Sequence, residues 1–329
     1  MLSTCTVVGL VSKPQLNGRA GSVLSYDSVS LRYIVKVDGE DESLKLKPEN
    51  VLMPADANIV TTHTALVQKH VQLMSLLATA ESSGNRAHEA AFCSDVGTVL
   101  KNMQHYEKAV QYHQRAIDIS LELQSTAPED NLMHRSNEGT FRSNLGICMR
   151  RLGRQESAVD SLKHALEIAE ETASSANTDI LTRSALVAQG MARGNLGATY
   201  TDLGSRDDDQ STHELAIEVL ERGLAITRQV GHPALEKNIL GNLASAHNAL
   251  QNCIRAQKPH LADHSSQAAG REVALKYAEE SLALKRQAGD QRGVANSLLS
   301  IGALLCEMGQ HAKGKQHLEE GLAIADSLM

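Results

Sequence analysis

The ten residues "NLGICMRRLG" at positions 144–153 decide the fold of this chain, because near-copies of them recur along the sequence. The copies are "DVGTVLKNMQ" at 95–104, "NLGATYTDLG" at 195–204, "NLASAHNALQ" at 242–251 and "SIGALLCEMG" at 300–309. Their third residues are small and lie 49, 51, 47 and 58 residues apart: Gly97, Gly146, Gly197, Ala244 and Gly302. Such a period predicts an array of similar units, each too small to bury its own apolar face.

A second set of small residues follows each copy. Two small positions, seven residues apart, are followed three residues later by isoleucine or leucine. The pairs are Ala109 and Ala116, Ala158 and Ala165, Ala216 and Gly223, Ala274 and Ser281, and Gly314 and Gly321. Antiparallel helices pack closely where the side chains at their crossing are small, and an interval of seven keeps both positions on one face. Each unit is therefore predicted to be a helical hairpin. With a preceding helix over 61–85, we expect eleven helices.

Local signals mark several helix boundaries. Gly84-Asn85, Gly231-His232 and Gly289-Asp290 each offer a glycine suited to a left-handed stop, and Asn85 and Asp290 can cap the next helix. Pro233 fits a first helical turn. The polar stretches "STAPEDN" and "TASSANTD" lack this pattern, which predicts longer loops or extended helix ends there.

The first fifty residues follow the period of strands instead. "LRYIVKV" places Leu31, Tyr33, Val35 and Val37 on one face, and "SLKLK" does the same with Leu44 and Leu46. Turns are predicted at Asn17-Gly18, Tyr26-Asp27-Ser28, Asp38-Gly39 and Pro48. A small barrel over 1–54, followed by a linker over 53–60, is the expected arrangement.

The repeat pattern resembles that of tetratricopeptide (TPR) proteins, in the longer-period form of kinesin light chains and G-protein-signalling modulators. The resemblance covers about 62–329, as an N-terminal cap helix and five repeats. The tryptophan position of that family holds other residues here: Cys93, Arg142, Arg193, Leu240 and Leu298. Residues 1–54 resemble Src-homology-3-like or Tudor/KOW-like barrels. The resemblance implies a mainly α fold, a right-handed α-solenoid of TPR hairpins preceded by a small all-β barrel.

Composition excludes several classes of function. The net charge of −7 and only eight aromatic residues argue against nucleic acid, which needs cations for phosphates and rings for bases. Five cysteines without a CxxC pair indicate a reduced, intracellular protein. No signal peptide or membrane-spanning run is recognisable, so we predict no membrane partner and a cytoplasmic protein, with a nuclear or ciliary location left open.

Motifs for catalysis and cofactors are absent. The sequence contains no Walker loop, GxGxxG, HExxH or GxSxG, so neither an enzyme nor a cofactor is predicted. A weak metal candidate is formed by Cys253, His260, Asp263 and His264. We interpret these residues as part of a polar surface loop over about 252–267. The acidic run at 207–209 is interpreted as a helix cap, since carboxylates complement a helix N-terminus.

The first residue of three copies is asparagine, and these residues share the face expected to line the groove. They are Asn144, Asn195 and Asn242, with Asp202 and Ser245 on the same face. The family resemblance implies that such asparagines hold the backbone of a bound peptide. The alternative is that each satisfies a neighbouring helix. Lys101, Arg150 and Arg151 favour a partner with acidic side chains.

The predicted function is a non-enzymatic adaptor that binds an extended peptide or helix of a protein partner in its concave groove. Two alternatives stay open: a permanent structural subunit of a large assembly, and a regulatory or sensor component of an enzyme system. The sequence does not name the partner, the pathway or the oligomeric state. The last helix reaches Met329 without the polar helix that commonly closes such arrays, which indicates either a partner at that end or a piece of a longer chain.

Overall fold

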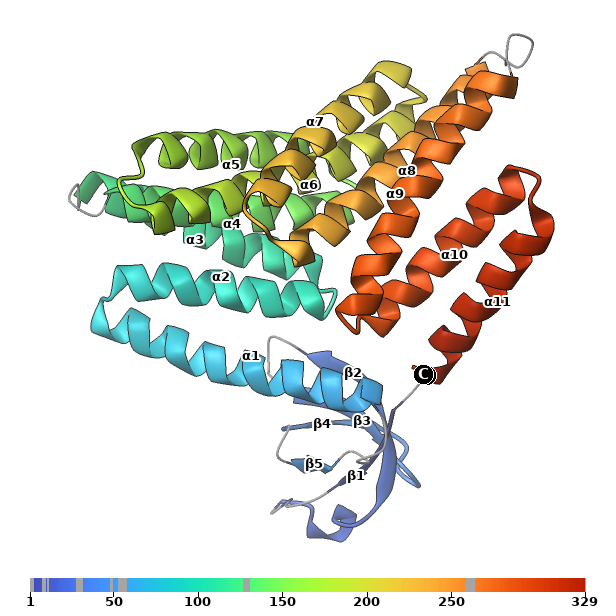
Figure 1. Cartoon of the computed structure of the whole chain (residues 1–329). Coiled ribbons are helices and arrows are strands. Elements are labelled where there is room, and N and C mark those ends of the chain that lie inside the picture. The colour runs from blue at the N-terminus through green and yellow to red at the C-terminus, as the bar shows by residue number, and fades with distance from the viewer. Residues whose placement is uncertain are drawn as a thin grey trace.

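A computed structural model describes residues 3–7, 10, 12–27, 32–47, 50–52, 58–126, 131–257 and 264–328. Side chains at 3–4, 26–27, 52, 58–64 and 264–267 are outside this description. Strands occupy the beginning of the chain and helices follow (Figure 1). Among the described residues, no helix is long and apolar enough to cross a membrane, and all five cysteines are free thiols.

Five short strands form one antiparallel sheet in the order β4-β3-β2-β1-β5. Their bounds are β1 Ser3–Val7, β2 Ala20–Asp27, β3 Arg32–Val37, β4 Ser43–Leu46 and β5 Val51–Leu52, with a 3-10 turn at Pro14–Leu16. Tyr33, Val35 and Val37 are buried and their neighbours in β3 are half-buried, which confirms the predicted alternation. Leu31 and Pro48 lie outside the described residues. In the described residues β4 and β5 do not pair, so the sheet is a half-barrel.

One predicted turn was wrong. Tyr26 and Asp27 continue β2, where they pair with Tyr33 and Arg32 of β3. Ser28, the last residue of that predicted turn, lies outside the described residues. A separate irregularity shifts the register of β2 between Val23 and Ser25. The turns at Gly18 and Gly39 are confirmed, because both glycines have positive φ.

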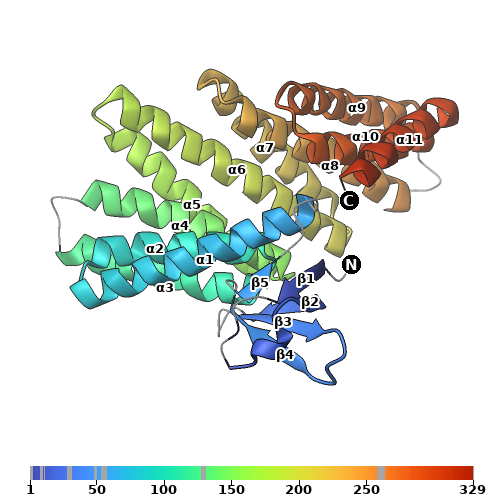
Figure 2. The same ribbon diagram turned by 90° about the horizontal axis from the view of Figure 1, so that it is seen from below.

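The core of the half-barrel extends into the helical part of the chain. Val67 of α1 (Asn58–Ser83) is completely buried in the same cluster as Tyr33 and Leu46, and Met103 packs against that cluster. Figures 1 and 2 both show the sheet against α1. The first helix therefore covers the open side of a sheet that is too small to bury its apolar face alone.

Ten further helices form five hairpins, which gives the eleven helices predicted for the described residues. They are α2 Arg86–Asn102, α3 Tyr106–Thr126, α4 Asn131–Arg151, α5 Gln155–Ser175, α6 Asp179–Asp207, α7 Gln210–Gln229, α8 Pro233–Gln257, α9 His264–Gln287, α10 Gln291–Glu307 and α11 His311–Ser327. Each even-numbered helix packs on the next helix of its hairpin, and successive hairpins stack (Figures 1 and 2). Helices α2, α4, α6, α8 and α10 carry the repeated decapeptides and are called the inner helices.

The hairpins are tight where the sequence predicted small residues. A Cβ on Gly197 would lie 2.4 Å from Cγ of Leu220 and 3.1 Å from the carbonyl oxygen of Ala216. Gly146 and Gly302 meet Leu162 and Leu318 in the same way. Glycine is therefore required by the helix crossing itself, although it is a poor helix former.

The predicted punctuation between hairpins is confirmed. Gly289 has a φ of 66°, a left-handed conformation that suits glycine, and Asp290 accepts a hydrogen bond from the Gly293 amide at 2.9 Å. Asn85 caps α2 through the amide of His88, as predicted. His232 also accepts from the Leu235 amide, a cap that was not predicted. The two stretches without this pattern do contain extended helix ends: α3 reaches Thr126 and α5 reaches Ser175.

Two insertions are helical extensions. In repeat 3, α6 continues to Asp207, and Asp209 caps α7 through the amides of Ser211 and Thr212, as the cap interpretation predicted. In repeat 4, the expected polar loop over 252–267 was wrong at both ends. α8 continues to Gln257, because its apolar packing extends to the buried Cys253. α9 already begins at His264.

Candidate partner-binding groove

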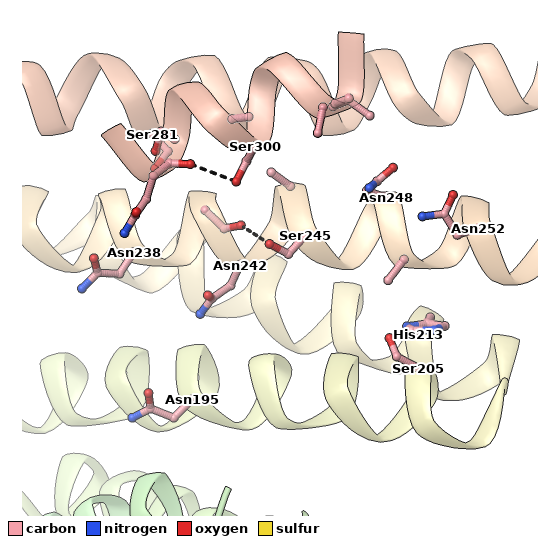
Figure 3. Close-up of a pocket in the computed structure, with 18 of the residues that line it drawn as sticks. Asn195, Ser205, His213, Asn238, Asn242, Ser245, Asn248, Asn252, Ser281 and Ser300 are labelled. Atoms are coloured by element: carbon pink, nitrogen blue, oxygen red, sulfur yellow. Dashed lines mark hydrogen bonds between the residues drawn. The ribbon is translucent and has the colours of Figure 1, made fainter. Parts of the chain in front are cut away.

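An open hollow of about 1030 Å³ lies over the inner helices α4, α6, α8 and α10. Residues from the outer helices α7 and α9 also contribute to its wall. Its lining contains no aromatic residue apart from His213 and is rich in asparagine and serine. Figure 3 shows the labelled amides of α6 and α8 with Ser300 beyond them. We call this hollow the groove. Its polarity suits a hydrogen-bonding ligand better than an apolar one.

Polar side chains follow one face of α8 along the groove. The set is Asn238, Asn242, Ser245, Asn248 and Asn252, all of which line the groove (Figure 3). Their spacings of three or four residues place them on one side of a helix. Helix α8 therefore presents a polar stripe parallel to its own axis.

Five of the eight residues predicted to bind a partner line the groove, and three do not. Those that line it are Asn195, Asn242, Ser245, Arg150 and Arg151. Asn144 instead lines a smaller cavity of about 60 Å³ between α4, α5 and α6. Lys101 lies on α2 and bonds Asn144, whereas Asp202 lies on α6 and bonds Arg150.

The repeated asparagines are partly used inside the solenoid. Lys101 donates to Oδ1 of Asn144 at 3.0 Å, and Asn242 donates from Nδ2 to the Gly194 carbonyl at 3.0 Å. Asn195 makes a longer contact of 3.4 Å from Nδ2 to Oγ of Ser143. Each bond joins one inner helix to the preceding inner helix. One end of each amide therefore bonds a neighbouring helix, which is the alternative to peptide binding that the sequence left open.

The charges around the groove are mostly positive. Arg150 forms an ion pair with Asp202 at 2.6 Å, whereas Arg151 has no ion pair among the described residues. Lys285 donates to Oγ of Ser297 at 2.7 Å. Burial lowers the pKa of Lys285, a change opposed by Asp290 and reinforced by Lys237. Asp208 is the only carboxylate among the described lining residues.

Sequence comparison across the repeats missed several groove residues. Asn238 and Asn252 lie outside the aligned decapeptides, and Lys285 lies on the second helix of its hairpin. Asn248 lies inside its decapeptide, but no other copy has asparagine at that position. The signal that could have found the three asparagines is the recurrence of asparagine at intervals of four or ten residues within α8 itself. An alignment of the repeats detects only residues that several repeats share, and these asparagines occur in one repeat.

The weak metal candidate gains no support within the described residues. His260 and Asp263 lie outside them, and so does the side chain of His264. Cys253 is buried, and its Sγ contacts Nε2 of Gln257 at 3.3 Å. No group of three or more metal-binding side chains occurs in the part of the chain that is described.

No protein-family model and no curated protein sequence matches the chain, whereas several solved structures are similar to it. BtubC (BKLC) from P. vanneervenii superposes with a TM-score of 0.53 at 16% identity, over 80% of this chain and 92% of that one. A Rap protein in complex with Competence and Sporulation Factor gives 0.49 at 13% identity, over 84% and 68% of the two chains. A Podosopora anserina kinesin light chain with nearly identical TPR-like repeats gives 0.45 at 16%, over 71% and 94%. The chain is a TPR-type α-solenoid preceded by a small strand half-barrel.

Proposed function

We propose that this protein is a non-enzymatic adaptor whose groove binds an extended segment of a partner protein. The observation that carries the proposal is the groove of about 1030 Å³, lined by polar side chains from four consecutive inner helices. Amide and hydroxyl groups can bond a peptide backbone whatever its side chains are. The solenoid, residues 62–329, would bind the partner. The small barrel, residues 1–54, would support it.

The polar lining favours an extended peptide over an amphipathic helix. A helix bound in a groove buries an apolar face and therefore needs an apolar surface opposite it. Asparagine, serine and cationic side chains instead satisfy exposed backbone groups and carboxylates. The partner segment is therefore expected to be polar and to lack regular structure before it binds.

A substitution that fills the groove tests the proposal. Ser245 is exposed on α8, and its Oγ bonds only the Gly241 carbonyl of its own helix at 3.1 Å. Ser174 on α5 makes the same local bond to Glu170 and does not line the groove. Tagged full-length chains with Ser245→Trp or Ser174→Trp should both retain their helicity.

Proteins that co-purify with the full chain are then identified by cross-linking and mass spectrometry. Loss of a cross-linked partner with Ser245→Trp, and its retention with Ser174→Trp, is the expected result. Equal retention with both variants would place the partner outside the groove. Retention of the partner after a high-salt wash would favour the alternative of a permanent subunit.

A further inference from the structure

One side of α11 exposes an apolar position that the other hairpins bury. The outer helices α3, α5, α7 and α9 each pack on the inner helix of the following hairpin. The residue directly after the second small position of each outer helix lies in that contact. Ile117, Leu224 and Leu282 are 1%, 5% and 6% exposed there, and Leu166 is partly buried. In α11 the same position holds Leu322, which is 53% exposed.

Leu318 extends this apolar surface by one helical turn, because residues four apart lie on one face of a helix. It corresponds to Ala278 of α9, which is buried in a cluster with residues of α10. Leu318 packs with one side on Gly302 of its own hairpin and is only partly buried. Figures 1 and 2 both show α11 at the edge of the array, with α10 on one side and no described helix on the other.

Opposite charges flank the two leucines on the same side of α11. Lys315 corresponds to Leu275 of α9, which packs against the cluster on α10, and Lys315 itself is 76% exposed. Asp326 is exposed near the other end of α11. Residues at the position of Asp326 form ion pairs with the next inner helix in two earlier hairpins: Glu170 with Arg193, and Arg228 with Glu236. We call Lys315, Leu318, Leu322 and Asp326 the α11 face.

The α11 face is complementary to itself when two copies of α11 run antiparallel. A two-fold axis level with Glu320 places Leu318 of one copy beside Leu322 of the other. Lys315 then lies about one residue, roughly 1.5 Å of helix rise, from the level of Asp326 of the second copy. The 3.6 Å contact of Lys315 with Glu319 of its own helix is a solvent-exposed pair, which contributes little.

From this surface we infer that the chain forms a two-fold dimer in which α11 packs antiparallel on α11 of a second copy. Leu318 and Leu322 of both copies form the apolar centre, and two Lys315–Asp326 pairs join the ends. Successive helices of the array also run antiparallel (Figure 1), so the second copy takes the orientation of a following inner helix. Two helices of 17 residues bury less than the standard stable interface of about 1,600 Å². The dimer is therefore reversible and depends on concentration.

The groove stays open in this dimer. None of the described residues of α11 lines it, so each dimer carries two accessible grooves. This consequence rests on the proposed function: two segments of one partner are held by one particle, which raises the apparent affinity without a new contact. The dimer contact itself does not involve the groove, and its test needs no partner.

Sedimentation velocity of the full chain between about 1 and 500 µM tests the contact, because interfaces below the standard size are typically weak. A reductant keeps the partly exposed thiol of Cys306 from forming a disulfide. Leu322→Asp should raise the dissociation constant of the dimer by about tenfold or more, since it places a carboxylate in the apolar centre. Leu215→Asp is the control, because Leu215 is 40% exposed on α7, two hairpins away, and should leave the dimer unchanged.

Charge reversal tests the direction of the two helices. Lys315→Glu and Asp326→Lys should each weaken the dimer by about tenfold, because like charges then meet at both ends. Mixing the two variants should restore dimers that contain one chain of each kind, in which every end again pairs opposite charges. Fluorescence-detected sedimentation of one labelled variant measures this restoration. Restoration requires both variants to be folded, so it separates a lost contact from a lost fold.

Three results would overturn the inference. The first is a chain that stays monomeric over the whole concentration range. The second is a dimer that Leu322→Asp leaves intact, or growth beyond a dimer, which would indicate head-to-tail association through other surfaces. The third is a dimer that both charge variants lose and that mixing does not restore, which would exclude the antiparallel arrangement.

Discussion

His113 on α3 occupies the position that holds leucine in three of the other hairpins and Ala278 in the hairpin of α8 and α9. Leu162, Leu220 and Leu318 contact the small residue of their inner helix, and His113 contacts Gly97 in the same way. The imidazole is completely buried, and neither ring nitrogen has a partner in the described residues. Burial of an unsatisfied polar group costs about 1–3 kcal/mol. His113→Leu should therefore raise the free energy of unfolding by about 1 kcal/mol or more in urea titrations at pH 7. A lower stability would show that the ring has a partner.

The same residue predicts a pH dependence. Burial, reinforced by Lys101, lowers the pKa of His113 to about 3 from an ordinary value of 6.5. Between these values the unfolded chain binds a proton that the folded chain does not, so stability is complete above pH 6.5 and falls on acidification. The loss is up to about 1.4 kcal/mol per pH unit. Urea titrations at pH 7, 6 and 5 give the free energy of unfolding at each pH. This free energy should fall less steeply with acidification in His113→Leu than in the wild type. Equal pH dependence in the two chains would contradict a lowered pKa of His113.

Some residues of the groove were predictable from the sequence and others were not. The repeated asparagines were visible as a column, and Asn195 and Asn242 do line the groove. Their bonds to Ser143 and Gly194 were not predictable, because a sequence pattern does not give the distance between consecutive inner helices. Asn248 and Asn252 escaped notice since no other repeat has them.

At the scale of elements, the close crossing of helices within a hairpin can be tested with two glycine substitutions, one at the crossing and one away from it. Gly197→Ala places a Cβ against Leu220 and should destabilise the chain by about 1–3 kcal/mol, despite the better helix propensity of alanine. Gly241 is also helical, but a Cβ there would meet only Oγ of Ser281 at 3.5 Å and Nζ of Lys285 at 3.7 Å. Gly241→Ala should therefore be neutral or stabilise by up to about 1 kcal/mol. Thermal unfolding measures both, and equal losses would refute the close-crossing explanation.

The order of the elements was largely predictable and the lengths of some were not. Gly231 and Gly289 each specify a helix stop locally and Asp290 specifies a cap, so these boundaries were predictable from the sequence. Gly204 lies inside α6, where the buried His213 packs on it, and the helix continues to Asp207. The end of α6 depends on this tertiary contact, so the local sequence did not predict it.

At the scale of the whole molecule, the half-barrel and the solenoid share a core. Val67 of α1 is buried among the residues of the sheet, so a chain of residues 1–56 would expose that surface. This fragment is expected to unfold at a lower temperature and less cooperatively than the sheet does in the full chain, as followed by circular dichroism. A fragment that melts as sharply and as high as the full chain would show that the contact with α1 is dispensable.

The central claim concerns where a partner lies, and hydrogen–deuterium exchange tests it most directly. Exchange is measured on the full chain alone and with its co-purified partner. Binding in the groove predicts added protection in α8 and α10, whose residues line it, with little change in the outer helices α3 and α5. Protection confined to those outer helices or to the half-barrel, with α8 unchanged, would contradict the account.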